Sequence, residues 1–400
     1  MTHQKNVLAH ILCLFPLVIA APLGLDIFLP GVPMAALELG SDAGMTQWLI
    51  SGFVLCLSLS QLFFGPVVDR WGSQRVLLCG CSIYALGALG VYFADSISLL
   101  ILLRLMQGCG AGAMAVAVFA SVPLRFHGAM VGKVFSILNG MISLVPVLAP
   151  IVGGALIVHY GWKSSFYLLG IFALVCGVLA SWRPLPEGTT GSDTSAPAVS
   201  AMTGYLDVLR HSQFQLGCFC GTFGFATQLI FFSSSPAVLI ETLHIPVDRF
   251  GYYFAINALA ITVGSLLTAR LLGRVKENVL LLGGALLLLL AGIGFMITVY
   301  VMGISVWAYI AAATIGSMGF AVLIGTGAAV ALTPFTQMAG RASALLAAIQ
   351  MSFSSLVSWW VIATWSPQWS SMIVAYVLLA AAIIVLLYRA KVNTAKAQSV

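Results

Sequence analysis

"VLAHILCLFPLVIAAPLGL", Val7 to Leu25, is a stretch of nineteen residues without a charged side chain. A helix of about 20 apolar residues is long enough to cross the hydrocarbon core of a bilayer. The stretch therefore predicts a membrane-spanning helix. The next residue, Asp26, places a carboxylate in the same apolar run. A charge near the bilayer centre costs on the order of 2.5–3.5 kcal/mol on insertion scales, so Asp26 requires a structural or functional reason.

Composition extends this interpretation to the whole chain. Of the 400 residues, 61% are hydrophobic and only 7% are charged, whereas soluble domains carry roughly 25% charged residues. Such a chain cannot be a water-soluble globular protein. In lipid the backbone must satisfy its own hydrogen bonds, which leaves helices or a closed barrel. The apolar segments are continuous rather than short and alternating, which predicts an all-α membrane protein.

Twelve apolar segments can be counted along the chain. They span roughly residues 8–30, 46–68, 76–94, 97–122, 132–158, 163–182, 212–241, 250–272, 278–301, 304–331, 338–364 and 370–389. The first has some features of a cleaved secretory signal, because Lys5 precedes it and small residues follow at Ala20 and Ala21. Pro22 directly after them, the continuing apolar stretch and the eleven further segments favour a retained membrane helix.

The distribution of Lys and Arg predicts the orientation of these helices. With a cytoplasmic N-terminus, fourteen of these residues fall in loops or at helix ends on the inner side, and only Lys163 and Arg249 fall on the outer side. Cytoplasmic loops carry the excess of positive charge in membrane proteins. We therefore expect both termini to be cytoplasmic. The net charge of +6 follows from this topology, and we expect no nucleic-acid partner.

One long polar segment divides the chain into two parts. "PLPEGTTGSDTSAPAVSAMTG", residues 184–204, is rich in Pro, Gly, Ser, Thr and Ala and is typical of a flexible linker. Six predicted helices precede it and six follow. The expected organisation is a six-helix bundle over 1–183, a cytoplasmic linker over 184–207 and a second six-helix bundle over 208–400. Two such bundles are typical of transporters that move about a central site.

Only two charged residues lie well inside predicted helices, Asp26 and Arg104. Asp26 is 18 residues past Leu8, about 27 Å along its helix, and Arg104 is 7 residues past Ile97, about 10 Å along a helix of opposite direction. Both depths correspond to the outer half of the bilayer. Isolated lipid-facing charges would be costly, so both should face a protein or water-filled interior. A shared cavity is compatible with these depths, and direct contact stays open.

This pair suggests a proton-coupling role. A low-dielectric cavity disfavours an ionised carboxyl, while a nearby arginine favours it. Rearrangement of Asp26 relative to Arg104 would then switch the affinity for a proton taken up outside and released inside. The alternatives are a structural carboxylate that packs helices at Asp26, and a structural anchor at Arg104 that binds backbone carbonyls.

The loop after the second segment resembles a known family signature. "GPVVDRWGSQRVLL", Gly65 to Leu78, resembles the Gly-x-Leu-x-Asp-Arg-x-Gly-Arg-Arg/Lys loop of the major facilitator superfamily. The matching residues are Gly65, Asp69, Arg70, Gly72 and Arg75. The chain departs from the pattern at Val67, Ser73 and Gln74. The resemblance implies a conformational latch between the bundles, and ordinary positive-inside charge is the alternative.

Two further stretches resemble signatures of the same family. "LLRLMQGCGAGA", Leu102 to Ala113, resembles the helix 4 signature that carries Arg104. "VPVLAPIVGGAL", Val145 to Leu156, resembles the helix 5 antiporter signature through Pro150, Gly153 and Gly154. These small residues would let helices approach closely and bend, and plain packing is the alternative. The family implies a twelve-helix fold in two bundles.

The opening stretch narrows the resemblance to one branch. "LDIFLPGVP", Leu25 to Pro33, is similar to the start of the Bcr/CflA branch, and Phe231 to Ala260 resembles its helix 7–8 region. The branch implies proton-driven export of antibiotics such as phenicols or bicyclomycin across the bacterial inner membrane. We expect a monomer that binds small molecules and protons. Export of an endogenous metabolite, such as a siderophore, by the same machinery is the alternative.

Polar or aromatic side chains deep in the helices are candidates for the substrate pocket. Besides Asp26 they are Asn139, Phe231, Phe232, Tyr253, Asn257 and Gln350. An apolar pocket with few polar anchors suits amphipathic molecules. Each of these side chains has helix packing as its alternative role.

Several other motifs fail on inspection. "GCGAGA", Gly108 to Ala113, has no preceding strand, so Gly108 and Gly112 are better explained by small-residue helix packing. No phosphate-binding Gly-x-x-x-x-Gly-Lys-Ser/Thr stretch occurs in the sequence. The eight Cys lie nearly all in helices, and the six His form no ligand cluster. We expect no cofactor and no metal. A membrane-embedded enzyme or sensor finds no support in paired acids or nucleophile–base spacing.

Overall fold

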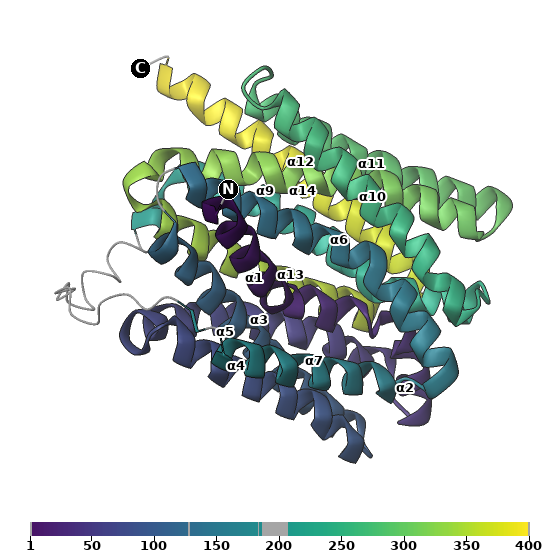
Figure 1. Cartoon of the computed structure of the whole chain (residues 1–400). Coiled ribbons are helices and arrows are strands. Elements are labelled where there is room, and N and C mark those ends of the chain that lie inside the picture. The colour runs from purple at the N-terminus through teal and green to yellow at the C-terminus, as the bar shows by residue number, and fades with distance from the viewer. Residues whose placement is uncertain (1, 127–128, 183, 186–206, 399–400) are drawn as a thin grey trace. The chain divides into compact units, whose positions relative to one another are not determined.

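The computed structural model describes residues 2–126, 129–182, 184–185 and 207–398 (Figure 1). The first half of the described chain is helical. Its elements are α1 (Thr2–Asp26), η1 (Leu29–Gly31), α2 (Val32–Glu38), α3 (Ala43–Trp71), α4 (Ser73–Leu89), η2 (Gly90–Phe93), α5 (Ile97–Arg125), α6 (Ala129–Tyr160) and α7 (Lys163–Trp182).

The second half repeats this helical pattern. Its elements are α9 (Ser212–Pro236), η3 (Ala237–Thr242), α10 (Val247–Leu271), α11 (Glu277–Met302), α12 (Val306–Leu332), η4 (Thr333–Met338), α13 (Ala339–Thr364) and α14 (Gln368–Gln398). Within the described residues, twelve helical segments are long and apolar enough to cross a membrane. The prediction of an all-α protein with twelve membrane-spanning helices is confirmed.

Several helix boundaries differ from the sequence-based prediction, and two of the differences have a clear physical reason. The first predicted segment, 8–30, is interrupted after Asp26. The last predicted segment ended at 389, whereas α14 continues to Gln398. Hydropathy detects where a chain stops being apolar, but the residues after 389 include Ala, Lys and Gln, which are good helix formers in water. The helix therefore extends beyond the end of its apolar segment.

The chain forms two compact units. One comprises Met1–Asp193 with Ile245–Ala255, and the other comprises Thr194–His244 with Ile256–Val400. Helix α10 thus contributes its first turns to unit 1 and the rest to unit 2. The predicted bundle limits, 1–183 and 208–400, stay predictions. Of the predicted linker over 184–207, only residues 184, 185 and 207 are among those described.

Helix α5 is the centre of unit 1, where it packs against α3, α4 and α1 (Figure 1). Gly108 and Gly112 lie on the face of α5 toward α3. A Cβ at Gly108 would overlap the carbonyl of Phe53, and one at Gly112 would overlap that of Leu57. The two backbones therefore touch because these side chains are absent. This confirms the prediction of small-residue packing at Gly108 and Gly112.

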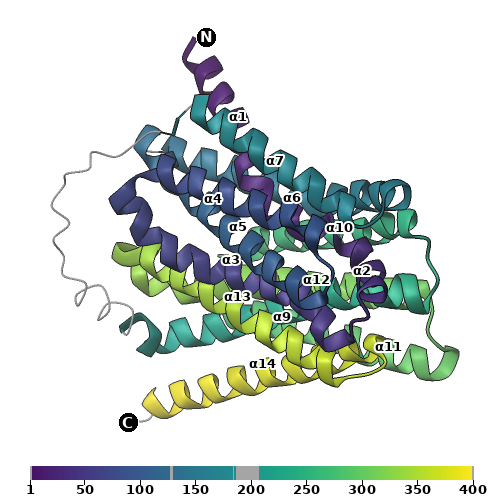
Figure 2. The ribbon, with the colours of Figure 1, turned by 90° about the horizontal axis from the view of Figure 1, so that it is seen from below.

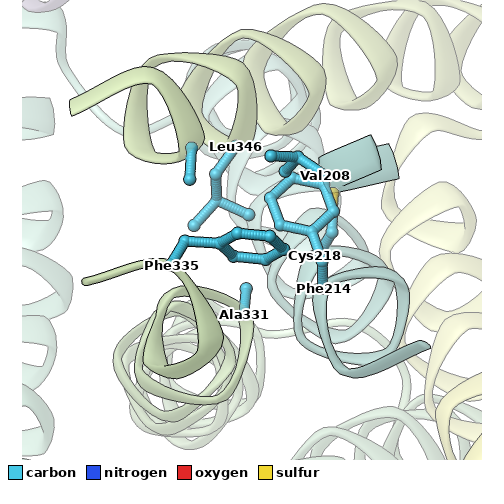
Figure 3. Packing of buried hydrophobic residues seen from close by; sticks show 7 residues of the cluster. Val208, Phe214, Cys218, Ala331, Phe335 and Leu346 are labelled. Carbon is cyan, nitrogen blue, oxygen red and sulfur yellow. The ribbon is translucent and has the colours of Figure 1, made fainter. Parts of the chain in front are cut away.

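Helix α9 is the centre of unit 2, and it packs against α12, α13 and α14 (Figure 2). At one end of this packing lies an apolar cluster shown in Figure 3. Its buried members are Val208, Phe214, Cys218, Ala331, Phe335, Ala342 and Leu346. The Phe335 ring meets Phe214 edge to face at 6.1 Å. The cluster holds α9, α12 and α13 together at this end.

The contact between α3 and α5 yields a stability prediction. Gly108→Ala inserts a methyl group against the Phe53 carbonyl, and overpacking of this kind typically costs about 1–3 kcal/mol. Gly283→Ala on α11 is the matched control, because a Cβ there meets no atom within 4 Å. We expect thermal unfolding in detergent to show a lower midpoint for Gly108→Ala and an unchanged or higher one for Gly283→Ala. Equal midpoints would contradict the close α3–α5 approach.

Candidate functional site

The first membrane segment is broken directly after Asp26, the last residue of α1. In a continuous helix the N–H of residue 30 would bond to the Asp26 carbonyl, but Pro30 has no N–H and its ring would crowd that oxygen. Helix α1 accommodates Pro16 and Pro22 in its interior. The helix is interrupted only where several helix-breaking residues lie close together, namely Pro30, Gly31 and Pro33. Interrupted helices are a frequent way to place ion and substrate sites inside a membrane transporter.

Asp26 is enclosed by protein at this break. Its side chain is 1% exposed, and its Oδ1 has no hydrogen-bond partner. Ile27 and Phe28, which follow it, are equally buried. A buried carboxylate without a partner costs several kcal/mol, whereas a protonated carboxyl is tolerated far better. The site can therefore hold a proton, and ionisation requires a change in its surroundings.

Arg104 on α5 connects three parts of unit 1. Its Nε donates to the Leu49 carbonyl at 2.9 Å, and its Nη1 donates to the Gly24 carbonyl at 2.9 Å. Nη1 also donates to Oε1 of Gln107 at 2.8 Å. The Gly24 carbonyl lies in the last turn of α1, where the helix itself supplies no donors. Arg104 thus binds the end of α1 to α3 and α5.

Aromatic rings enclose the same guanidinium. The centroid of the Phe53 ring is 4.4 Å from its Cζ, and those of Phe28 and Phe166 are each 5.7 Å away. Arg104 is fully buried, yet its Nη2 has no partner. Its hydrogen bonds go to carbonyl and amide oxygens, and none joins it to Asp26. The two charged residues lie near one helix end without forming an ion pair, so the anchor role of Arg104 has direct geometric support.

The glycines of the helix 5 signature lie on α6 and face two other segments. A Cβ at Gly153 would overlap the Ile27 carbonyl, next to Asp26, and one at Gly154 would meet the Val247 carbonyl at the start of α10. On the α10 side of this contact, Gly251 has no Cβ and so leaves room for the backbone of Ile151 of α6. Pro150 is buried in the same stretch. Small residues therefore bring α6 against both the α1 break and the first turns of α10.

The loop signature joins α3 to α4 by a single residue. Gly72 has φ +83°, a conformation that residues with a side chain rarely adopt. Asp69, Arg70 and Arg75 flank this turn and are exposed. A Cβ at Gly65 would meet nothing within 4 Å. The geometry accounts for Gly72 in the motif, and a latch role for the charged residues stays a prediction.

Gln74, a departure from the family pattern, has a specific use here. Its Nε2 donates to the Ala180 carbonyl at 2.9 Å, and its Oε1 accepts from the Leu185 N–H at 2.9 Å. One amide therefore binds the last turn of α7 and the chain that leaves it. Arg or Lys, the residues of the family pattern, could donate to Ala180 but could not accept from Leu185.

Three buried polar side chains form a closed hydrogen-bond ring in unit 2. Gln228 donates to Asn257 at 3.0 Å, Asn257 donates to Ser317 at 2.5 Å, and Ser317 donates back to Gln228 at 2.7 Å. Asn257 also donates to the Ala313 carbonyl at 3.2 Å. The ring binds α9, α10 and α12 together. Both amide hydrogens of Asn257 are used, so it has no donor left for a substrate.

The other pocket candidates have varied surroundings. Phe231 is fully buried, with its ring centroid 5.9 Å from that of Tyr309. Phe232 and Tyr253 are partly exposed. Asn139 is exposed and donates to the Phe135 carbonyl at 2.9 Å. Gln350 is 6% exposed, and its Nε2 has no partner. Their roles as pocket residues stay predictions.

Sequence reasoning assigned no role to the side chains of Gln74, Gln107, Gln228, Ser317 and Gly251. A signal existed for Gln228 and Ser317, because amides and hydroxyls in the middle of apolar helices need partners. Gln74 was visible only as a mismatch to a pattern. Among the described residues, no group of three His, Cys, Asp or Glu side chains is placed to hold a metal ion.

Comparison with known proteins identifies the family. The model of the Major Facilitator Superfamily matches residues 14–358, so the chain belongs to this family of membrane transporters and is not an enzyme. The multidrug resistance proteins MdtL of Salmonella paratyphi C and of Salmonella typhimurium are each 29% identical to it over 358 residues, which cover 87% of both chains. With twelve candidate spans among the described residues, it is a multi-pass membrane protein.

Solved transporter structures share the fold. A POT family transporter in complex with 5-aminolevulinic acid superposes with a TM-score of 0.77 at 14% identity, covering 97% of this chain and 96% of that one. The nucleoside transporter NupG gives 0.73 at 14% identity, covering 94% and 98%. A D-xylose-proton symporter gives 0.69 at 14% identity, covering 94% and 97%. At these identities the likeness concerns the fold alone.

The hydrogen bonds of Arg104 yield a testable expectation. Arg104→Ala removes the hydrogen bonds to the Gly24 and Leu49 carbonyls, and hydrogen bonds to a charged group contribute about 1.5–3 kcal/mol each. Lys keeps the charge but lacks the planar fork that reaches several oxygens at once. We expect impaired uptake into inverted vesicles for Arg104→Lys and no uptake for Arg104→Ala, with normal membrane insertion.

The exposed Arg274→Lys serves as the control for this pair and should behave as wild type. Full transport by Arg104→Ala would show that the connection between α1, α3 and α5 is dispensable for function.

Proposed function

We propose that this protein is a proton-coupled antiporter that exports small amphipathic molecules, with antibiotics as substrates. Relatives named multidrug resistance protein MdtL cover 87% of the chain at 29% identity, which supports drug export. The family membership supports a small-molecule substrate. We place the protein in the bacterial inner membrane, as a monomer with both termini in the cytoplasm.

The main support for proton coupling is that Asp26 is buried and that its Oδ1 has no hydrogen-bond partner. Within the described part of the chain, Asp26 and Arg104 are the only buried residues of charged type. The Asp26 Oδ1 has no donor in this conformation. Protonation of Asp26 removes its charge and therefore stabilises the conformation in which the side chain is enclosed by protein. Release of the proton requires water or a donor to reach the carboxylate, which couples protonation to conformation.

The break after α1 links the protonation of Asp26 to the positions of neighbouring helices. Asp26 is the last helical residue before the break, Arg104 binds the Gly24 carbonyl two residues earlier, and Gly153 of α6 packs on the Ile27 carbonyl directly after Asp26. A shift of α6 or α5 therefore changes the surroundings of Asp26 directly. Each proton that moves inward carries about 2.3 kcal/mol per 100 mV of membrane potential, plus any pH gradient. This energy drives export of a substrate against its gradient.

For the substrates we propose neutral or zwitterionic antibiotics such as phenicols or bicyclomycin, as in the Bcr/CflA branch. Phe231, Phe232, Tyr253 and Gln350 are the proposed contacts, with Asn139 at the exposed edge. Asn257 would then act mainly by holding the helices that carry them, because its donors are used within the ring. Expression in an efflux-deficient host should raise the inhibitory concentrations of chloramphenicol or bicyclomycin. Unchanged susceptibility to a broad antibiotic panel would contradict drug export.

Asp26→Asn tests the proton site. Asn fills the same space but cannot release a proton, so we expect coupled export to be abolished. The measurement is proton release on addition of chloramphenicol to inverted vesicles that contain the variant. Asp95→Asn, at an exposed carboxylate before α5, is the control and should couple normally. Normal coupling in Asp26→Asn would place the proton site elsewhere.

Asp69→Asn tests the proposed latch. Asp69 lies in the last turn of α3, exposed and beside the Gly72 turn. Loss of its charge should shift the balance between inward-open and outward-open states by about 1–3 kcal/mol, the usual size of a coupling between sites. We expect the affinity for chloramphenicol, measured by calorimetry, to change by less than about tenfold while turnover falls much further. An equal collapse of both in folded protein would mean that Asp69 shapes the binding site.

A further inference from the structure

The packing of α13 against α9 contains a buried amide donor that the protein does not satisfy. Gln350 of α13 is 6% exposed, and its Nε2 is buried without a hydrogen-bond partner. Directly opposite lies Gly221 of α9, where a Cβ would overlap this same nitrogen. The amide therefore occupies space that a glycine leaves open, somewhat before the midpoint of the candidate span Ala342–Thr364.

The neighbours of Gln350 one turn away on the same face of α13 have suitable partners on α9. One turn before it, Leu346 belongs to the apolar cluster with Phe214 and Cys218 of α9 (Figure 3). One turn after it, Ser354 donates to the Thr222 carbonyl of α9 at 2.9 Å. Gln350 lies between this apolar cluster and the hydrogen-bonded Ser354, and it alone of the three leaves a polar group without a partner. A buried donor without a partner destabilises the folded protein, and a Met or Leu at this position would avoid that cost.

A second unpartnered group lies on the third helix of this packing. The Thr326 Oγ1 of α12 is buried and has no hydrogen-bond partner. The next residue, Gly327, packs against the backbone of Gly217 and Gly221. Two polar groups without partners thus occur where α9, α12 and α13 meet, whereas the nearby ring of Gln228, Asn257 and Ser317 is closed on itself.

The polar interior of unit 2 is uncharged over the residues that the structure describes. Its buried polar side chains are amides and hydroxyls, and the two buried residues of charged type, Asp26 and Arg104, belong to unit 1. The buried side chains of unit 2 therefore offer a ligand group at Gln350 donors and acceptors but no ion. Such surroundings accept a neutral hydrogen-bond acceptor and disfavour an uncompensated charge.

We propose that Gln350 is a specificity-determining residue whose Nε2 donates to a carbonyl oxygen of the transported molecule. The preferred substrates are neutral compounds with an amide or lactam carbonyl. This inference rests on the proposed function, because it assumes that the chain exports small molecules. It goes further by naming the chemical group that unit 2 recognises and the atom that recognises it.

The test compares chloramphenicol, which carries a neutral amide, with its thioamide analogue. The exchange of oxygen for sulfur keeps the N–H group and weakens the acceptor. Binding to the purified full-length protein in nanodiscs is measured by calorimetry for wild type, Gln350→Met and Gln350→Leu. Met has a similar length to Gln, Leu is shorter, and neither side chain has a hydrogen-bond donor. Leu346→Met, one turn away on the same face, is the matched control.

We expect wild type and Leu346→Met to prefer the amide by about three- to tenfold, the usual value of one neutral hydrogen bond. Gln350→Met and Gln350→Leu should bind both compounds with nearly equal affinity, because neither side chain can donate to the carbonyl. Gly221→Ala, which displaces the amide without changing it, should reduce the preference in the same direction. Thermal unfolding identifies any variant that is misfolded, and Gln350→Met should be at least as stable as wild type.

A preference for the amide that persists in both Gln350 variants would overturn the proposal, because a group other than Gln350 would then recognise the carbonyl. Equal binding of the two compounds by the wild type would overturn it as well. Either result leaves drug export intact, since export is judged separately by the inhibitory concentrations. Failure of export itself would appear as unchanged susceptibility of cells that express the wild type.

Discussion

The hydrogen bonds of the Arg104 guanidinium are the constraint on which the rest of unit 1 depends. A fully buried guanidinium is tolerated because carbonyl oxygens of α1 and α3 and an amide of α5 accept its hydrogens, and because aromatic rings surround it. The Gly24 carbonyl is available only because α1 ends two residues later. The cation and the helix break therefore stabilise each other, and Asp26 is placed at their junction.

Glycine contacts transmit this arrangement to the neighbouring helices. Gly108 and Gly112 let α5 touch α3, while Gly153 lets α6 touch the chain immediately after Asp26. Contacts between backbones allow little adjustment by side chains, since a packed interface has few intermediate arrangements. Movements of α5 or α6 are therefore expected to act on the Asp26 environment as a unit. This is a direct way to couple a protonation event to the movement of helices.

The two units differ in the kind of polar chemistry that they bury. Over the described residues, unit 1 encloses a carboxyl and a guanidinium, whereas unit 2 encloses amides and hydroxyls. In unit 2 most of these groups satisfy one another, as in the ring of Gln228, Asn257 and Ser317. The amide of Gln350 does not. Under the proposed mechanism, the first kind of chemistry binds protons and the second binds a neutral substrate.

The sequence by itself determined the class of fold, because twelve long apolar segments leave the backbone no alternative to helices in lipid. It also singled out Asp26 and Arg104, since charges are rare in such segments, and it identified the close packing at Gly108 and Gly112. Only the tertiary structure decided what these residues touch. Hydropathy does not show that Pro30 ends α1 at Asp26 within an unbroken apolar run, or that Arg104 binds carbonyls rather than the carboxylate. The second use of Gln74 and the unsatisfied amide of Gln350 were equally hidden, because hydrogen-bond partners come from segments far apart in the chain.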